Sequence, residues 1–218
     1  MKNYLLVLVL IVAASVTLYS LDTYGGAKAS AELGWLSGSD WVDGINFLDD
    51  SGNGQPSKIR FGVSVGGYVG FKLTANLSLQ LEMLFSSIGG SYSVTYGGVD
   101  MDGKLWANVL QFPVLVRPQT TVGDGILYSL VGASPLLILG DLHTKASSGG
   151  VSAESTDTPD NTFNVALIAG AGYAFAAGAG NLELELRFFH SLLDIYDNDN
   201  TRLNSIELFI GYAMQIPQ

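Results

Sequence analysis

Hydrophobic and polar residues alternate with a period of two along most of the chain. In the segment NLELELRFFH, residues 181–190, leucines alternate with glutamates. Successive side chains of a β-strand point to opposite faces, so this period predicts strands, and we expect no helix after the N-terminal segment. Eight such segments predict strands over 26–36, 58–72, 77–88, 105–117, 126–138, 162–176, 181–191 and 203–216.

The breaks between these segments alternate between long and short. The long breaks are 37–57, 89–104, 139–161 and 192–202, and the short ones are 73–76, 118–125 and 177–180. Long loops at one end and tight turns at the other are typical of membrane β-barrels of bacterial outer membranes. The chain is therefore predicted to be all-β, a single antiparallel up-and-down transmembrane β-barrel of about eight strands.

The two faces of each predicted strand differ in a way that indicates which face meets lipid. In 77–86, one face carries leucine, methionine and phenylalanine, and the other includes Ser78, Gln80 and Glu82. Charged residues make up only 14% of the chain, against roughly 25% in soluble domains. We therefore expect the leucines of 181–190 to face lipid, and the small and polar residues to fill a narrow lumen.

Charged residues recur on the predicted lumen face. A buried charge is costly unless it is paired, so we expect these groups to form ion pairs, with Lys28 as a further base. Such a network could seal the barrel, line a selective passage or include a catalytic carboxylate pair. The predicted lumen charges are Glu32, Arg60, Glu82, Arg117, Glu183, Glu185, Arg187 and Glu207.

The N-terminal segment has the pattern of a secretory signal. Lys2 precedes the apolar run YLLVLVLIVAASV, and Ser20 offers a small residue for cleavage. We expect a signal peptide over 1–20 and a barrel domain over 21–218; the alternative is a retained membrane anchor. The chain has no cysteine, so a lipid-anchored lipoprotein is excluded.

The net charge of −10 comes from the long breaks, which contain thirteen acids and three bases. We expect these loops to be extracellular and both termini to be periplasmic. Acidic loops argue against nucleic acid as a partner, and basic proteins or cations are the partners that they would attract.

Candidate chemistry is sparse. His190 lies near Asp194 and could belong to a catalytic site at the outer rim, and His143 is the only other histidine. Calcium loops are suggested by Asp197, Asp199 and Thr201 and by DDSGNG at 49–54, although the ligand pattern is incomplete. We expect no cofactor and no enzymatic activity.

Aromatic residues expected in membrane-interface girdles are Trp35, Trp41, Trp106, Tyr128, Tyr173 and Tyr212.

The second half of the chain resembles the PorT-like outer-membrane β-barrel domain family, and through it the OmpX and OmpA group of small eight-stranded barrels. The resemblance rests on VLQFPVLVRPQ, YSLVGASPLLIL, FNVALIAGAGYAF, NLELELRFFHSLLDIY and SIELFIGYAM. It implies a location in the outer membrane and insertion by the barrel-assembly machinery. Many members of the family have no assigned activity.

Together these features predict a non-enzymatic, integral outer-membrane barrel with a structural or surface-interaction role, which we expect to be a monomer. Two alternatives stay open at this point. A small-solute or ion channel would need an open lumen, which the many lumen glycines would allow. A soluble lipid-carrying barrel would need its apolar rows to face inward.

Overall fold

The computed structural model describes residues 22–49, 54–159, 161–194 and 201–217. They form twelve strands and one helix. No helix in these ranges is long and apolar enough to cross a membrane. The predicted signal peptide lies outside the described residues. In chain order the elements are β1 (Thr23–Ser37), α2 (Ser39–Leu48), β2 (Gln55–Lys58), β3 (Arg60–Thr74), β4 (Leu77–Tyr96), β5 (Val99–Gln111), β6 (Val114–Val122), β7 (Gly125–Ile138), β8 (Leu142–Ser148), β9 (Val151–Asp157), β10 (Phe163–Ala177), β11 (Gly180–Ser191) and β12 (Arg202–Ile216).

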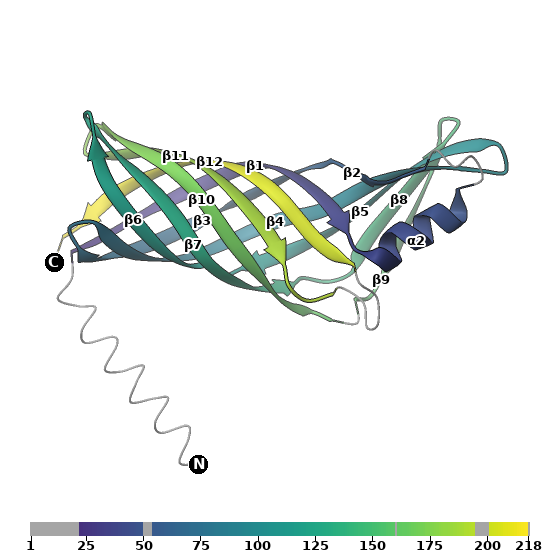
Figure 1. Ribbon diagram of the computed structural model, residues 1–218, viewed down its shortest axis with the longest axis horizontal. Coiled ribbons are helices and arrows are strands. Elements are labelled where there is room, and N and C mark those ends of the chain that lie inside the picture. The colour runs from purple at the N-terminus through teal and green to yellow at the C-terminus, as the bar shows by residue number, and fades with distance from the viewer. Residues whose placement is uncertain (1–21, 50–53, 160, 195–200, 218) are drawn as a thin grey trace, which may run out of the picture.

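Eight of these strands close into a ring. β1 pairs with β12 on one side and with β3 on the other, and antiparallel pairing continues through β4, β6, β7, β10 and β11 back to β12. The first and last strands are neighbours, with Thr23 opposite Ile216. The prediction of an antiparallel barrel of about eight strands is confirmed (Figure 1).

The predicted strand over 105–117 is divided into β5 and β6 at Phe112 and Pro113. Proline lacks an N–H and interrupts a strand ladder. Residues 77–81 of β4 pair with β6, and residues 84–96 pair with β5. The Pro113 carbonyl still accepts a hydrogen bond from the Glu82 N–H at 2.9 Å, so the wall of the barrel stays closed across the interruption.

Two of the long breaks form β-hairpins rather than the predicted loops. The β4–β5 hairpin extends to Gly97 and Gly98, and a β8–β9 hairpin turns at Gly149 and Gly150. All four glycines have positive φ, between 55° and 86°, as two-residue hairpin turns require. The prediction of loops over 89–104 and 139–161 is therefore wrong, because these Gly-Gly pairs are hairpin turns.

The prediction that no helix follows the N-terminal segment is also wrong. α2 is only ten residues long, too short to show a sustained helical period. Tertiary contacts hold it in place: Ile45 is buried, and Trp41 packs on Tyr92 with 5.6 Å between ring centroids. The Trp41 indole also donates a hydrogen bond to the Pro56 carbonyl at 2.6 Å.

The barrel thus has two different ends (Figure 1). At one end, here called the turn end, lie the tight turns at 75–76, 123–124 and 178–179 and the described chain termini. The other end is here called the loop end. Beyond the ring at this end extend α2, β2, β8, β9 and the parts of β4 and β5 that are next to their hairpin turn.

The outer wall is apolar. On β11, Leu184, Leu186 and Phe188 are 44–55% exposed, whereas Glu185 and Arg187 between them are buried. Tyr173 and Tyr212 lie on this wall near the turn end, where their hydroxyls donate to carbonyls of the turns at 2.9 Å. Trp35 packs on Phe188 toward the loop end. This distribution of apolar and amphipathic side chains suits a hydrocarbon layer bordered by two interfaces.

Two of the expected girdle residues lie elsewhere. Tyr128 is 2% exposed and points into the barrel, because its neighbours Leu127 and Ser129 take the outward positions of β7. Trp41 belongs to α2 and packs on Tyr92. The prediction is wrong for these two residues, because strand parity turns Tyr128 inward and Trp41 belongs to a helix rather than a strand.

The interior is apolar near the loop end, which the sequence pattern did not reveal. The expected lumen face was small and polar, but both faces of β7 carry large apolar side chains in this part of the barrel. The buried cluster includes Leu36, Ile88, Val109, Leu136, Ile138, Ile168, Phe189 and Leu203.

Several lumen glycines lie directly beneath tyrosine rings. A Cβ added to Gly70 would lie 2.0 Å from Cζ of Tyr24, and one added to Gly172 would lie 2.4 Å from Cζ of Tyr128. In both cases the two residues are cross-strand partners. The space that the glycines leave is therefore filled by aromatic rings, as is known for glycines in curved sheets.

The outward position of Leu184 gives a first prediction. Leu184→Arg should lower the free energy of unfolding by about 2–4 kcal/mol, because a charge would enter the hydrocarbon layer. Urea titration in lipid vesicles measures this. Val151→Arg at the exposed tip of the β8–β9 hairpin is the control, and we expect a change within about 0.5 kcal/mol. Equal effects of the two substitutions would contradict this placement of the apolar wall.

The tyrosine over Gly172 gives a second prediction. Gly172→Ala should destabilise the barrel by about 1–3 kcal/mol, since the Tyr128 ring has to move to admit the methyl group. The control is Gly44→Ala in α2, where an added Cβ meets nothing within 4 Å and alanine favours the helix. Urea titration measures the free energy of unfolding of both variants. If Gly172→Ala left this free energy unchanged, the Tyr128 ring would not require a glycine at position 172.

Candidate functional site in the barrel lumen

The polar part of the lumen is built from side chains on strands that face each other across the barrel. Lys28 lies on β1, Glu82 on β4, and Glu185 and Arg187 on β11. Each points inward because the residues on either side of it point outward. All four side chains are at most 2% exposed.

Arg187 and Glu82 form the centre of this site. Nη1 of Arg187 donates to Oε2 of Glu82 at 2.8 Å, and Nη2 donates to Oε1 at 2.6 Å. Nε of Arg187 donates to Glu185. Nζ of Lys28 lies 2.9 Å from Glu82 and 3.5 Å from Glu185. Two bases thus face two acids, so the cluster is formally neutral.

A second ion pair adjoins the first on the side of the turn end. Nη2 of Arg117 donates to Glu183 at 2.7 Å, and the Tyr68 hydroxyl donates to the same carboxylate at 2.6 Å. Gln80 joins the two parts, since it accepts from Arg117 at 3.0 Å and donates to Glu82. The Arg117 guanidinium lies over the Tyr128 ring, 3.6 Å from its centroid.

These contacts define what we call the lumen network. Buried ion pairs resist solvent only when their remaining hydrogen-bonding positions are filled, and here tyrosine hydroxyls and an amide fill several of them. Bidentate pairing holds the side chains in one geometry. Its members are Tyr24, Lys28, Tyr68, Gln80, Glu82, Arg117, Tyr128, Glu183, Glu185 and Arg187.

Three of the predicted lumen charges form no ion pair with any residue that the structure describes. Glu207 lies opposite Arg187 in the β11–β12 register, but its described hydrogen bond is with Ser205 at 3.3 Å. Glu32 faces Glu207 across β1 and β12. The Arg60 guanidinium donates to Ser87 on β4 and interacts with the Glu32 carboxylate without forming an ion pair with it.

The tyrosine partners of the charges are not among the predicted lumen residues, whereas Gln80 lies on the face predicted to fill the lumen. Tyr24, Gln80 and Tyr128 contribute hydrogen bonds to the network, although the predicted site held only charged residues. Strand alternation predicts that these side chains point inward, because each is two or four residues from an inward-pointing residue of the same strand. A buried tyrosine normally finds a partner for its hydroxyl, which is the signal that could have identified them.

The candidate catalytic and calcium-binding residues have other partners. Nδ1 of His190 lies 2.6 Å from the Asn204 amide oxygen, and Asp194 pairs with Arg202 instead. The Asp49 carboxylate accepts hydrogen bonds from the backbone N–H groups of Gly54 and Thr95. Asp197 and Asp199 lie outside the described residues. Across the described ranges, no three histidine, aspartate or glutamate side chains are grouped so that they could hold a metal ion.

A small polar cavity of about 80 Å³ opens at the turn end. Tyr24, Arg117 and Glu183 form part of its wall, so solvent at this end meets the edge of the lumen network. The central pair of Arg187 and Glu82 is not among its lining residues.

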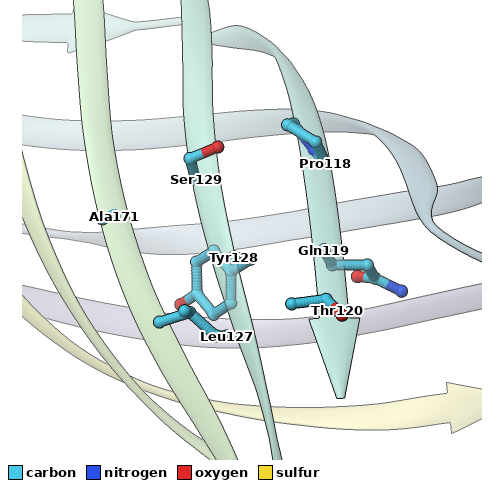
Figure 2. Close-up of a pocket in the computed structure, with 7 residues that line it drawn as sticks. All are labelled: Pro118, Gln119, Thr120, Leu127, Tyr128, Ser129 and Ala171. Carbon is cyan, nitrogen blue, oxygen red and sulfur yellow. The ribbon is translucent and has the colours of Figure 1, made fainter. Parts of the chain in front are cut away.

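A larger groove, of about 370 Å³, lies on the outer wall between β6, β7 and β10 (Figure 2). The pairing of β6 with β7 is interrupted here, because Pro118 has no N–H to donate. No charged residue is among those lining it. Its lining residues are Pro118, Gln119, Thr120, Leu127, Tyr128, Ser129 and Ala171.

Comparison with solved structures finds similar barrels at low sequence identity. Ail of Yersinia pestis is 14% identical, over 89% of this chain and 100% of that chain, with a TM-score of 0.39. OprG of Pseudomonas aeruginosa is 9% identical, over 90% and 97%, with a TM-score of 0.47. The outer membrane enzyme PagL is 13% identical, over 87% and 99%, with a TM-score of 0.38. A search of curated protein sequences finds no significant match.

The family comparison is more direct. The model of the outer membrane protein beta-barrel domain matches residues 37–197, which is most of the chain, and it agrees with the closed ring and its apolar wall. The chain therefore belongs to the family of outer membrane protein beta-barrel domains, and it is embedded in the lipid bilayer of the outer membrane.

Proposed function

We propose that this protein is a sealed, non-enzymatic barrel that holds its loop-end extension at the cell surface for a structural or surface-interaction role. The observation that carries the proposal is the bidentate Arg187–Glu82 pair, which joins β11 to β4 through the middle of the lumen. Residues from opposite walls meet there, and Lys28 from a third strand contacts the same carboxylate.

A second layer supports the same proposal. On the loop-end side of the lumen network, the interior is packed by apolar side chains such as Leu36, Ile138 and Phe189, each at most 5% exposed. An ion leaving the network in this direction would have to shed its hydration among apolar groups, which is strongly unfavourable.

A small-solute or ion channel is the second candidate. The polar cavity at the turn end favours it, since Arg117 and Glu183 there could meet a hydrated ion. A passage would require the Arg187–Glu82 pair to separate and the apolar layer to open. Two closed layers in series therefore favour the sealed barrel.

The remaining features of the proposal concern orientation and partners. We place the loop end outside the cell and both termini in the periplasm, after removal of the signal peptide and insertion by the barrel-assembly machinery. We expect a monomer within the PorT-like group. Basic proteins or cations are the partners that the acidic loop end would attract.

Planar-bilayer recording tests the proposal. The mature chain, refolded in detergent and checked for heat-modifiable gel mobility, should give no reproducible current steps in concentrated potassium chloride, because both interior layers are closed. A general porin inserted into the same bilayer is the positive control. Ohmic steps that scale with salt concentration would contradict the sealed barrel and favour the channel.

A further inference from the structure

A cleft with a basic lining lies on the outer wall of the barrel, near the start of the loop-end extension. Its volume is about 290 Å³. It shares no residue with the lumen network. The residues that line it, which we call the basic cleft, are Ile59, Arg60, Phe61, Ser91, Lys104, Trp106 and Lys145.

Two lysines face each other in this cleft. Lys104 on β5 and Lys145 on β8 are direct cross-strand partners, and like charges in such positions destabilise a sheet. Lys145 is balanced by Glu154 on β9, at 2.7 Å, and the Lys145 hydrogen bond lowers the pKa of Glu154. Lys104 is exposed and pairs with no acid among the residues that the structure describes. An anion beside Lys104 would relieve this repulsion.

Arg60 brings a third positive charge to the same place. The pairing of β3 with β4 stops at Ser64 and Ser86, and beyond this point the Arg60 guanidinium reaches β4. It donates to the carbonyl and the hydroxyl of Ser87, both at 3.0 Å, and lies 5.5 Å from the centre of the Trp106 ring. Trp106 in turn stacks on His143, with 5.2 Å between ring centroids.

The cleft is an exception within an acidic part of the molecule. Four bases lie in or beside it, namely Lys58, Arg60, Lys104 and Lys145, and the described acids that form ion pairs with them are Asp102 and Glu154. Each of these acids is already paired with a lysine. Lys104 is therefore left without an acidic partner among the described residues, and the Arg60 guanidinium, which also interacts with the Glu32 carboxylate, hydrogen-bonds to Ser87.

The position of the cleft indicates that its ligand is amphipathic. Ile59 and Phe61 form its apolar side and are 64% and 63% exposed. They lie where the apolar wall meets the charged extension, so a molecule bound here would have one end in hydrocarbon and one end in water. Tryptophan with basic side chains is typical of this interfacial depth.

We infer that the basic cleft binds a phosphate group of a lipid headgroup in the membrane leaflet at the loop end. Arginine and lysine are the side chains that bind phosphate by charge-assisted hydrogen bonds. Exposed Ile59 and Phe61 would contact the first carbons of the acyl chains. The inference requires the outer-membrane location, and it does not depend on whether the lumen is sealed.

Lipid binding in nanodiscs tests the inference. The full mature chain is placed in phosphatidylcholine nanodiscs containing a small fraction of lipid A, which carries phosphomonoesters, and retained lipid is measured by native mass spectrometry. Lys104→Gln and Arg60→Gln should each reduce lipid A retention about tenfold, the effect of losing one charge-assisted hydrogen bond. Lys72→Gln, at the turn end beside Asp22, is the matched control and should leave retention unchanged.

Two further arms identify the source of the phosphate. The wild type should retain lipid A without its phosphates no better than the Lys104→Gln variant retains intact lipid A. Inorganic phosphate at millimolar concentration should compete weakly, since it lacks the acyl chains. Equal retention of lipid A by the wild type and a folded Lys104→Gln variant, or full displacement by inorganic phosphate, would overturn the inference. Because Lys104 is exposed, heat-modifiable mobility should verify that this variant folds.

Discussion

The central constraint on this protein is that an eight-stranded barrel turns its apolar side chains outward and must fill a narrow interior with what is left. The Arg187–Glu82 pair meets this constraint by joining two opposite strands through the lumen. A charge placed there alone would be strongly unfavourable. Lys28 and Glu185 balance the pair, and the tyrosines and Gln80 occupy much of the remaining hydrogen-bonding capacity.

The other features of the interior follow from this arrangement. The tyrosines that support the ions need room, and glycines such as Gly70 and Gly172 on the neighbouring strands supply it. Toward the loop end the charges give way to an apolar cluster around Leu136 and Phe189. The barrel is therefore stabilised from inside by the ion pairs of the lumen network and by the apolar cluster. The loop-end extension carries the hairpins and the basic cleft outside this packed interior.

Much of this fold could be predicted from the sequence because a period of two is strong evidence of strands, and alternating break lengths indicate up-and-down pairing. The interior could be predicted only in part. The side chain of Glu82 on β4 meets Arg187 on β11, and these strands are not neighbours in the ring, so no local pattern encodes their contact. Arg60 has the parity of a lumen residue, but its guanidinium hydrogen-bonds to Ser87 on β4 beyond the end of the β3–β4 pairing. The hairpins at Gly97 and Gly149 interrupt the hydrophobic alternation, since β8 and β9 carry mostly polar side chains, and so the sequence pattern predicts loops there.

A double-mutant cycle between Glu82 and Arg187 tests the central claim most directly. Glu82→Gln, Arg187→Gln and the double variant are refolded into lipid vesicles, and the free energy of unfolding of each is measured against the wild type. If the pair organises the lumen, the double variant should be more stable than the sum of the single effects predicts, with a coupling of about 2 kcal/mol. A coupling within about 0.5 kcal/mol of zero would mean that the two side chains act independently and that the barrel does not depend on their contact.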